Sequence, residues 1–148
     1  MAIKDLPPEP VVPPNCNFVM YRQVGKMLIL SGYGPLWGSN VPKKFQGKVP
    51  KDVTVKEGYN ASKLTAMNLL LITRQAIKTL DKVDKIISVE GFVNSQPSFT
   101  DHPSVINGCS DFLVEVFGTN GHHTRSAIGS NSLAFGISVE ISMTLLLK

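Results

Sequence analysis

The stretch FVNSQPSFTDHPSVINGCSDFLVEVFG, residues 92–118, decides the fold because its periodicity changes along its length. It begins in an apolar strand centred on residues 86–93 and continues into a loop with Pro97 and Pro103. Proline is well tolerated in a first helical turn, because its missing amide proton would be unpaired there. Apolar residues then recur at helical spacing, at Val105, Ile106, Cys109, Phe112, Leu113, Val116 and Phe117. The stretch predicts strand, loop and helix, with Gly118 as the helix stop.

Upstream of this stretch, the sequence predicts an arm, a hairpin and a loop. Residues 1–15 are rich in proline, so we expect an extended arm before a single domain at residues 16–148. Strands are predicted at residues 18–24 and 27–31, joined by a tight turn at Gly25-Lys26. Gly32, Gly34 and Pro35 are expected to end the second strand, and residues 36–51 read as a loop.

A long helix is predicted between that loop and the strand at residues 86–93. Thr54 and Glu57 form a T-x-x-E capping box, in which the Thr side chain accepts the amide of Glu57 and the Glu side chain reaches back. The apolar residues that follow lie on one broad face: Leu64, Met67, Leu70, Leu71, Ala76, Ile77 and Leu80.

The C-terminal part predicts two strands, at residues 125–131 and 137–147. In the second strand apolar residues alternate with Ser138, Glu140, Ser142 and Thr144, which is the period of a half-buried strand. The order is therefore β-β-α-β-α-β-β. Two helical crossovers predict a sheet that is partly parallel and partly antiparallel, with both helices on one face: a two-layer α+β domain.

Such a domain leaves one sheet face without helices. On the last strand that face would carry Ser138, Glu140, Ser142 and Thr144, which are polar but weakly charged. A surface of this kind is better suited to burial against another subunit than to water, so we expect an oligomer with partly wet clefts between subunits.

The composition sets the broad class of the protein. The chain has 148 residues, 43% hydrophobic and 18% charged, with a net charge of +4. These values are typical of one globular domain. The lysines are scattered, so nucleic acid is not expected as a partner. The proline-rich start does not resemble a signal peptide and no apolar run is long enough to span a membrane, so we expect a cytoplasmic protein.

Three motifs carry a resemblance to a known family: GKMLILSGYGP, the stretch quoted above, and HHTRSAIGSNSL. With them the chain, from about Phe18 to its end, resembles the reactive-intermediate deaminase (Rid) family, also called YjgF-like or endoribonuclease L-PSP. The resemblance implies a chorismate-mutase-like fold and a homotrimer with inner sheets and outer helices. It also implies three small-molecule clefts between subunits, and no cofactor.

The resemblance also assigns residues to the cleft. Ser31, Gly32 and Asn107 carry over from the family pattern, while the family's tyrosine falls on Phe18. The arginine that grips the substrate carboxylate in the deaminases falls on Ser132, and the acidic residue that places water falls on Ser142. Glu140 is added as a second acidic candidate because it stands two residues before Ser142, and Arg125 is added as a candidate cation. The candidate cleft residues are therefore Phe18, Ser31, Gly32, Asn107, Arg125, Ser132, Glu140 and Ser142.

Several candidates have two interpretations. Arg125 either supplies the missing cation to the cleft or forms a structural salt bridge at a subunit boundary. His122 and His123 are either an acid–base pair or an exposed turn, and no third ligand gives them metal spacing. Asn107 bonds either a ligand or local backbone, whereas Cys109 is expected to be a buried packing residue.

Three functions follow as hypotheses. The first is hydrolysis of reactive enamines, imines or related carbonyl compounds by a trimeric Rid-like enzyme. The replacement of the cleft arginine by Ser132 favours the second, a trimer that binds a metabolite without turnover. The third is endoribonuclease activity, as in the older family label, for which only His122, His123 and Arg125 offer suitable groups.

Overall fold

The computed structural model describes residues 6–11 and 15–148, and in these ranges the predicted element order is confirmed. Five strands form one sheet in the order β1-β2-β5-β3-β4. Their bounds are β1 Tyr21–Val24, β2 Met27–Tyr33, β3 Val83–Asn94, β4 Thr124–Ser130 and β5 Val139–Leu147. The two helices are α1 Val55–Ile77 and α2 His102–Phe117.

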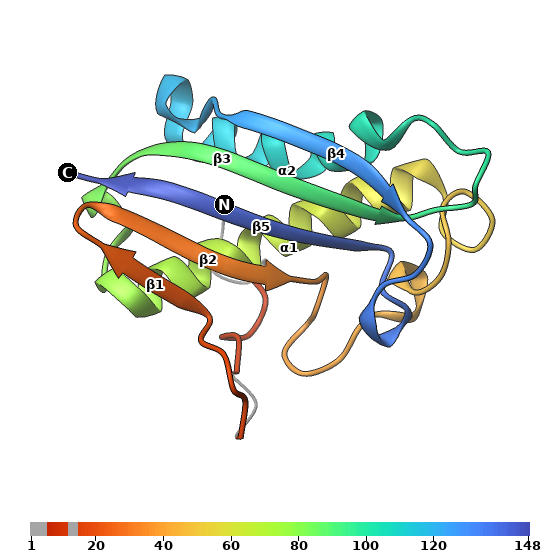
Figure 1. Ribbon diagram of the computed structural model, residues 1–148, viewed down its shortest axis with the longest axis horizontal. Helices are drawn as coiled ribbons and strands as arrows, with labels where there is room; N and C mark the ends of the chain where they lie inside the picture. Colours follow the sequence, from red (N-terminus) through yellow and green to blue (C-terminus); the bar gives the residue numbers. More distant parts are fainter. Residues whose placement is uncertain (1–5, 12–14) are drawn as a thin grey trace.

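The sheet is mixed, as predicted. Strands β3 and β4, joined by α2, run parallel, and every other neighbouring pair is antiparallel. Both helices lie on the same face of the sheet, so that the strands stand in front of α1 and α2 in Figure 1. The helices pack against each other and against the central strands. The result is the two-layer α+β domain that the element order predicted.

Local signals place the elements. Thr54 caps α1, since its hydroxyl accepts the Glu57 amide at 3.1 Å and the Glu57 carboxylate accepts the Thr54 amide at 2.9 Å. The bond from the Thr54 amide, with a second bond of 3.0 Å from the Thr54 hydroxyl to the same carboxylate, lowers the pKa of Glu57. Pro103 lies in the first turn of α2 and Gly118 ends it with a φ of +58°. Gly25 has a φ of +59° in the hairpin turn, where Val24 pairs with Met27.

The core lies between the helices and the facing side of the sheet. On β5, Val139, Ile141, Met143, Leu145 and Leu147 are buried and their neighbours are only half-buried, which confirms the predicted alternation. The central residues of β2 alternate in the same way, whereas β3 alternates from Val89 to Val93 and loses the pattern at Ile87 and Ser88, where its register with β5 shifts. The other side of the sheet, which we call the open face, bears no helix among the described elements.

Three sequence-based expectations were wrong in detail. Strand β1 begins at Tyr21, so Phe18 precedes the strand in which it was predicted to lie. Strand β2 does not end at Gly32 but continues to Tyr33, after a register shift between Leu30 and Tyr33 in its pairing with β5. Ser138 does not lie on the open face with Glu140. It precedes β5 and is fully buried, because its amide donates to the Phe45 carbonyl at 3.0 Å and the loop covers it.

The described part of the proline-rich arm packs on the outside of the helices. Pro7 and Pro10 are buried, and the Glu9 carboxylate pairs with the Arg74 guanidinium near the end of α1. Gln75 donates to both Glu9 and the Pro10 carbonyl, at 3.0 and 3.1 Å. No helix in the described residues combines the length and the apolarity that a membrane crossing requires.

Candidate functional site

A cavity of about 520 Å³ lies where β2 and β5 meet the loops that follow and precede them. This volume falls in the range of small-molecule sites. Three of the predicted cleft residues line it: Phe18, Gly32 and Glu140. The remaining lining residues are mostly apolar: Val11, Met20, Tyr33, Gly34, Leu36, Gly38, Ser39, Asn40, Val41, Gln46, Ala134, Phe135 and Ile137. We call this cavity the β2–β5 cavity.

Glu140 and Gly32 meet inside this cavity. The carboxylate of Glu140 lies so close over Gly32 that a methyl group at that position would collide with it. Glycine is therefore required for the carboxyl group to take this place. The register shift in the pairing of β2 with β5 occurs in this part of β2, between Leu30 and Tyr33. Bulges of this kind re-aim side chains and are common next to functional sites.

Two neighbours of Gly32 have different roles. Ser31 does not line the cavity, because its hydroxyl donates to the Val19 carbonyl at 2.6 Å and its amide donates to the Met20 carbonyl at 2.9 Å. These bonds hold the segment that carries Phe18. Tyr33 does line the cavity, and burial raises the pKa of its phenol, so the hydroxyl is protonated at neutral pH.

Arg125 and Asn107 come together elsewhere, on β4 and α2. The amide oxygen of Asn107 accepts a hydrogen bond of 2.7 Å from Nη1 of Arg125. The same nitrogen donates to the Ser110 hydroxyl at 3.2 Å. Among the described residues Arg125 has no carboxylate partner within salt-bridge distance, so no structural ion pair occupies it within the chain.

His123 completes this cluster of polar residues. Its Nδ1 lies 2.6 Å from the Gly121 carbonyl, and its Nε2 lies 2.9 Å from the Ser110 hydroxyl. The carbonyl can only accept, so Nδ1 carries the proton and Nε2 accepts from Ser110. Burial lowers the pKa of His123, which keeps the ring neutral at pH 7. His123 is thus half-buried and hydrogen-bonded, whereas His122 is exposed as an ordinary turn residue would be.

A cavity of about 410 Å³ adjoins this cluster and is lined by Ser110, Asp111, Val114, His122, His123 and Arg125. It shares no lining residue with the β2–β5 cavity. A single chain therefore divides the candidate cleft residues into two groups. Gly32, Phe18 and Glu140 form one group, and Asn107 with Arg125 forms the other.

Ser132 and Ser142 belong to neither group. Ser132 is exposed in the loop after β4, where its carbonyl accepts a bond of 2.7 Å from the Ser130 hydroxyl. Ser142 lies on the open face of β5, opposite Glu90 of β3. Of the two acidic-site candidates, Glu140 and not Ser142 lines the β2–β5 cavity. The cation that contacts Asn107 is Arg125, which lies on β4 and not at the position of Ser132 in the following loop.

Sequence reasoning missed a further pair in the opening stretch. The Ser95 hydroxyl and Nε2 of His102 lie 3.3 Å apart and line a cavity of about 340 Å³. A side chain at Gly129 would collide with both. The spacing of a serine and a histidine across a loop gave no signal, because only the parallel pairing of β3 with β4 brings Gly129 to them.

The remaining candidates are simpler. Cys109 is fully buried on α2, and burial raises the pKa of its thiol to about 12, so its predicted packing role is confirmed. The aromatic residues at the end of β2 and in the loop after it are divided: Tyr33 lines the β2–β5 cavity, and Trp37 lines a different one with Lys44 and Lys63. In residues 6–11 and 15–148 no cluster of three or more His, Cys, Asp or Glu side chains is arranged to hold a metal ion.

These features define a class of protein: a small α+β domain with two helices on one face of a mixed sheet and a ligand-sized cavity at the end of β2 and β5. The chain belongs to the YjgF family, since residues 4–140 match the family described as "YjgF/chorismate_mutase-like, putative endoribonuclease". The family resemblance inferred from the three sequence motifs is confirmed.

Three relatives are similar over most of their lengths. Protein TCP17 of Trypanosoma cruzi is 36% identical over 129 residues, which cover 86% of this chain and 79% of that protein. The structure of Atu1372 from Agrobacterium tumefaciens, a protein of unknown function, has a TM-score of 0.87 at 34% identity, covering 93% of this chain and 86% of that one. A "putative endoribonuclease" from Shewanella oneidensis MR-1 has a TM-score of 0.88 at 31% identity, covering 95% and 91%.

Proposed function

We propose that this protein is a homotrimeric hydrolase of reactive 2-imino or 2-enamino acids, or of related carbonyl compounds, with its sites between subunits. The observation that carries the proposal is the Glu140 carboxylate seated against Gly32 in the β2–β5 cavity. A carboxylate at the edge of an apolar cavity can orient water and accept its proton. Membership in the YjgF family does not by itself distinguish this reaction from RNA cleavage, since the family is described as "putative endoribonuclease". The reaction class comes from the resemblance of the sequence motifs to the reactive-intermediate deaminases.

The cavity of one chain is incomplete for such a substrate. Its described lining residues include Glu140 but no lysine or arginine, so nothing there would bind the substrate carboxylate. Arg125 is exposed and uses Nη1 for Asn107 and Ser110, which leaves the rest of the guanidinium fork available. Arginine is suited to this task because its planar fork matches a carboxylate. We place Arg125 and Asn107 of one subunit beside the β2–β5 cavity of the next.

The open face supports the trimer. It exposes apolar side chains of three strands, Val24, Met27, Ile29 and Ile128, between small polar residues. The face also carries Arg22, Glu90 and Glu140, and a partly apolar face of this kind is suited to packing against another subunit. In the proposed assembly the open face of each subunit turns inward. The proposal also includes a cytoplasmic location.

The reaction balances without a cofactor. Water adds through its oxygen to the imine carbon while Glu140 takes one of its protons, and the same proton then passes from Glu140 to the imine nitrogen. The resulting carbinolamine loses ammonia and leaves a 2-oxo acid. Arg125 of the neighbouring subunit would hold the substrate carboxylate, away from the like charge of Glu140. Asn107 would keep the guanidinium in place through its bond of 2.7 Å.

The test follows ammonia release from imino acids generated freshly by an amino acid oxidase, with semicarbazide trapping as the competing reaction. The wild-type protein should accelerate hydrolysis over buffer. Glu140→Gln, which keeps the shape and removes the base, should lower kcat at least tenfold. Arg125→Lys, which keeps the charge but not the fork, should mainly raise KM. Absence of acceleration for any of several imino acids would refute the proposal.

Endoribonuclease activity is the second candidate, because one cavity gathers His122, His123 and Arg125. Against it, both ring nitrogens of His123 are already engaged, with Gly121 and Ser110. Highly purified wild-type protein and His123→Ala should therefore cleave RNA equally little. Loss of a real RNA-cleaving activity in this variant would promote the second candidate over the first. A binding trimer without turnover is the outcome in which ligands stabilise the protein but no imino acid is hydrolysed.

A further inference from the structure

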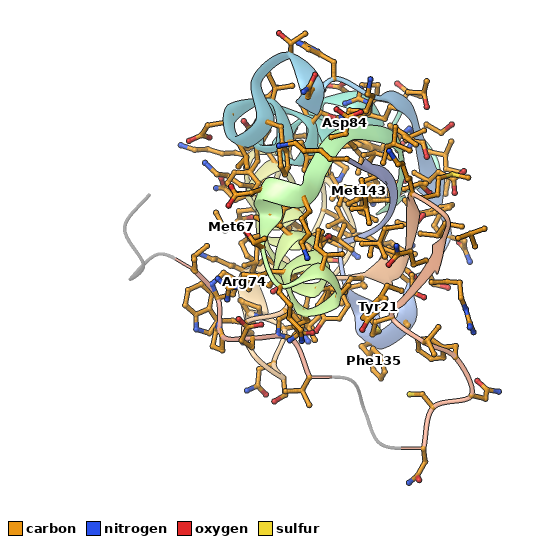
Figure 2. The ribbon with its side chains drawn as sticks, turned by 90° about the vertical axis from the view of Figure 1, so that its left-hand side faces the viewer. Tyr21, Met67, Arg74, Asp84, Phe135 and Met143 are labelled. Atoms are coloured by element: carbon orange, nitrogen blue, oxygen red, sulfur yellow. The ribbon has the colours of Figure 1, made fainter. Side chains whose placement is uncertain are left out.

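Two phenylalanine rings stand in water beside the β2–β5 cavity. Phe135 is 89% exposed and Phe18 is 54% exposed, and both line this cavity. Phe135 lies at the periphery of the fold, in the turn before β5 (Figure 2). Single exposed apolar residues are common on proteins. Two exposed rings that line the same ligand-sized cavity form one apolar patch, which a single bound ligand would cover.

The backbone of Phe135 adds a second, independent observation. Its φ is +59° and its ψ is 16°, in the left-handed region that a bulky residue rarely adopts. Glycine would take this conformation without steric cost, and Gly136 beside it has a φ of +66°. Because the Phe135 ring is 89% exposed, it buries little surface in the free chain that could offset the strain of its backbone. Backbone strain of this type clusters at ligand sites, where contact between the side chain and a bound ligand offsets its cost.

Hydrogen bonds from Ser31 of β2 hold the segment that contains Phe18. The Ser31 hydroxyl donates to the Val19 carbonyl at 2.6 Å, and its amide donates to the Met20 carbonyl at 2.9 Å. These bonds fix the chain directly after Phe18 without occupying the cavity. A contact surface that is ordered before binding loses less entropy when the ligand arrives.

The inner wall of the cavity continues the apolar surface of the two rings. Its side chains include Met20, Leu36, Val41 and Ile137, and Glu140 is the one charged residue among the lining residues that the structure describes. An occupant with a short side chain would leave this wall and the two rings in water. A flat or branched apolar group would cover them.

We propose that the site selects ligands with a bulky apolar side chain, aromatic ones above all, and that Phe18 and Phe135 determine this specificity. This inference rests on the proposed function, because it assigns the substrate class of the same site. The reacting carbon of a 2-imino acid would lie near Glu140, and its side chain would extend between Phe18 and Phe135.

The test measures binding without turnover, by isothermal titration calorimetry of the full-length protein with two stable 2-oxo acids, phenylpyruvate and pyruvate. Wild type should bind phenylpyruvate at least tenfold more tightly. Phe135→Ala should lose most of that preference while its affinity for pyruvate stays unchanged. Phe135→Tyr keeps a ring and should keep the preference. Phe135→Gly relieves the backbone strain, so it should unfold at a higher temperature than Phe135→Ala and still lose the preference.

The outcomes separate this inference from the proposed function. Preference for phenylpyruvate in a protein that hydrolyses no imino acid would refute the hydrolase and leave the inference standing. Equal affinity for the two acids, or no binding of phenylpyruvate, would overturn the inference. It would also be overturned if Phe135→Ala dissociated the oligomer, because the ring would then be a contact between copies of this chain and not part of a ligand site.

Discussion

At the scale of single residues, the contacts of Arg125 limit the roles that it can have within one chain. In the sequence it stood between two interpretations, a structural salt bridge and a cation for a cleft. The structure gives it neutral partners, the Asn107 amide and the Ser110 hydroxyl, and no carboxylate among the described residues. Amide and hydroxyl partners position a guanidinium without neutralising its charge. The guanidinium is therefore available to an anion outside the chain, and the proposed function assigns it a substrate carboxylate rather than a salt bridge at a subunit boundary.

Cys109 leads to a prediction at the same scale. Its thiol is fully buried and its pKa is raised to about 12, against roughly 8.5 in an unfolded chain. Because the folded pKa is the higher one, this stabilising contribution is complete below pH 8.5 and is lost as the pH rises from there toward 12. Between pH 8.5 and 10 the free energy of unfolding should fall by about 2 kcal/mol from this group.

The measurement is urea unfolding at several pH values for wild type and Cys109→Ala. Tyrosines and lysines also titrate in this range, so the difference between the two proteins isolates the thiol. The variant is less stable at neutral pH because it leaves a small cavity, but the gap should narrow as the pH rises. A gap that stays constant to pH 10 would contradict the buried, protonated thiol.

At the scale of elements, the crossing of α1 and α2 depends on a glycine. A methyl group at Gly108 of α2 would overlap the backbone carbonyl of Tyr59 in α1 and reach within 3.1 Å of the Lys63 amide nitrogen. Backbone cannot move aside as a side chain can. The two helices therefore approach as closely as they do because this position has no side chain.

Gly108→Ala should consequently destabilise the fold by about 1–3 kcal/mol. Inside an ordinary helix the same change stabilises by about 1 kcal/mol, so the sign is the test. Gly58→Ala is the matched control on α1. Its new methyl group would meet the Val105 side chain at 3.1 Å, which can shift, so the loss there should be smaller. Denaturant unfolding of both variants decides the question, and a more stable Gly108→Ala protein would refute it.

At the scale of the whole molecule, the proposed trimer turns the open face inward, and Ser142 lies in the middle of it. Ser142→Arg should dissociate the trimer, because three added charges would meet in a poorly solvated space. Glu90 lies opposite Ser142 and would partly neutralise the arginine within one chain. Ser142→Glu adds to the charge of Glu90 and should dissociate the trimer more completely.

Light scattering on wild type and both variants checks this prediction. Glu115→Arg, an exposed change on the outer surface of α2, is the control that alters charge without touching the open face. A wild-type mass equal to one chain would contradict the assembly. So would Ser142 variants that remain trimers of unchanged stability.

The sequence by itself determined the elements and their order. The capping box at Thr54, the hairpin turn at Gly25 and the alternation of β5 each involve residues a few positions apart, so their hydrogen bonds and periodicity can be read locally. The family motifs likewise lie in short stretches. The two-layer arrangement followed because two amphipathic helices and a mixed sheet have few ways to cover one another.

Only the tertiary structure decided which candidate residues meet. Glu140 reaches Gly32 because β2 and β5, more than 100 residues apart in the chain, pair with a shift of register at that point. Ser138 is buried because a distant loop covers it, and the hydroxyl of Ser31 turns to Val19 rather than to the cavity. Strand register and loop packing follow from the energy of the whole core, and a change of one residue in register reverses which face a side chain occupies.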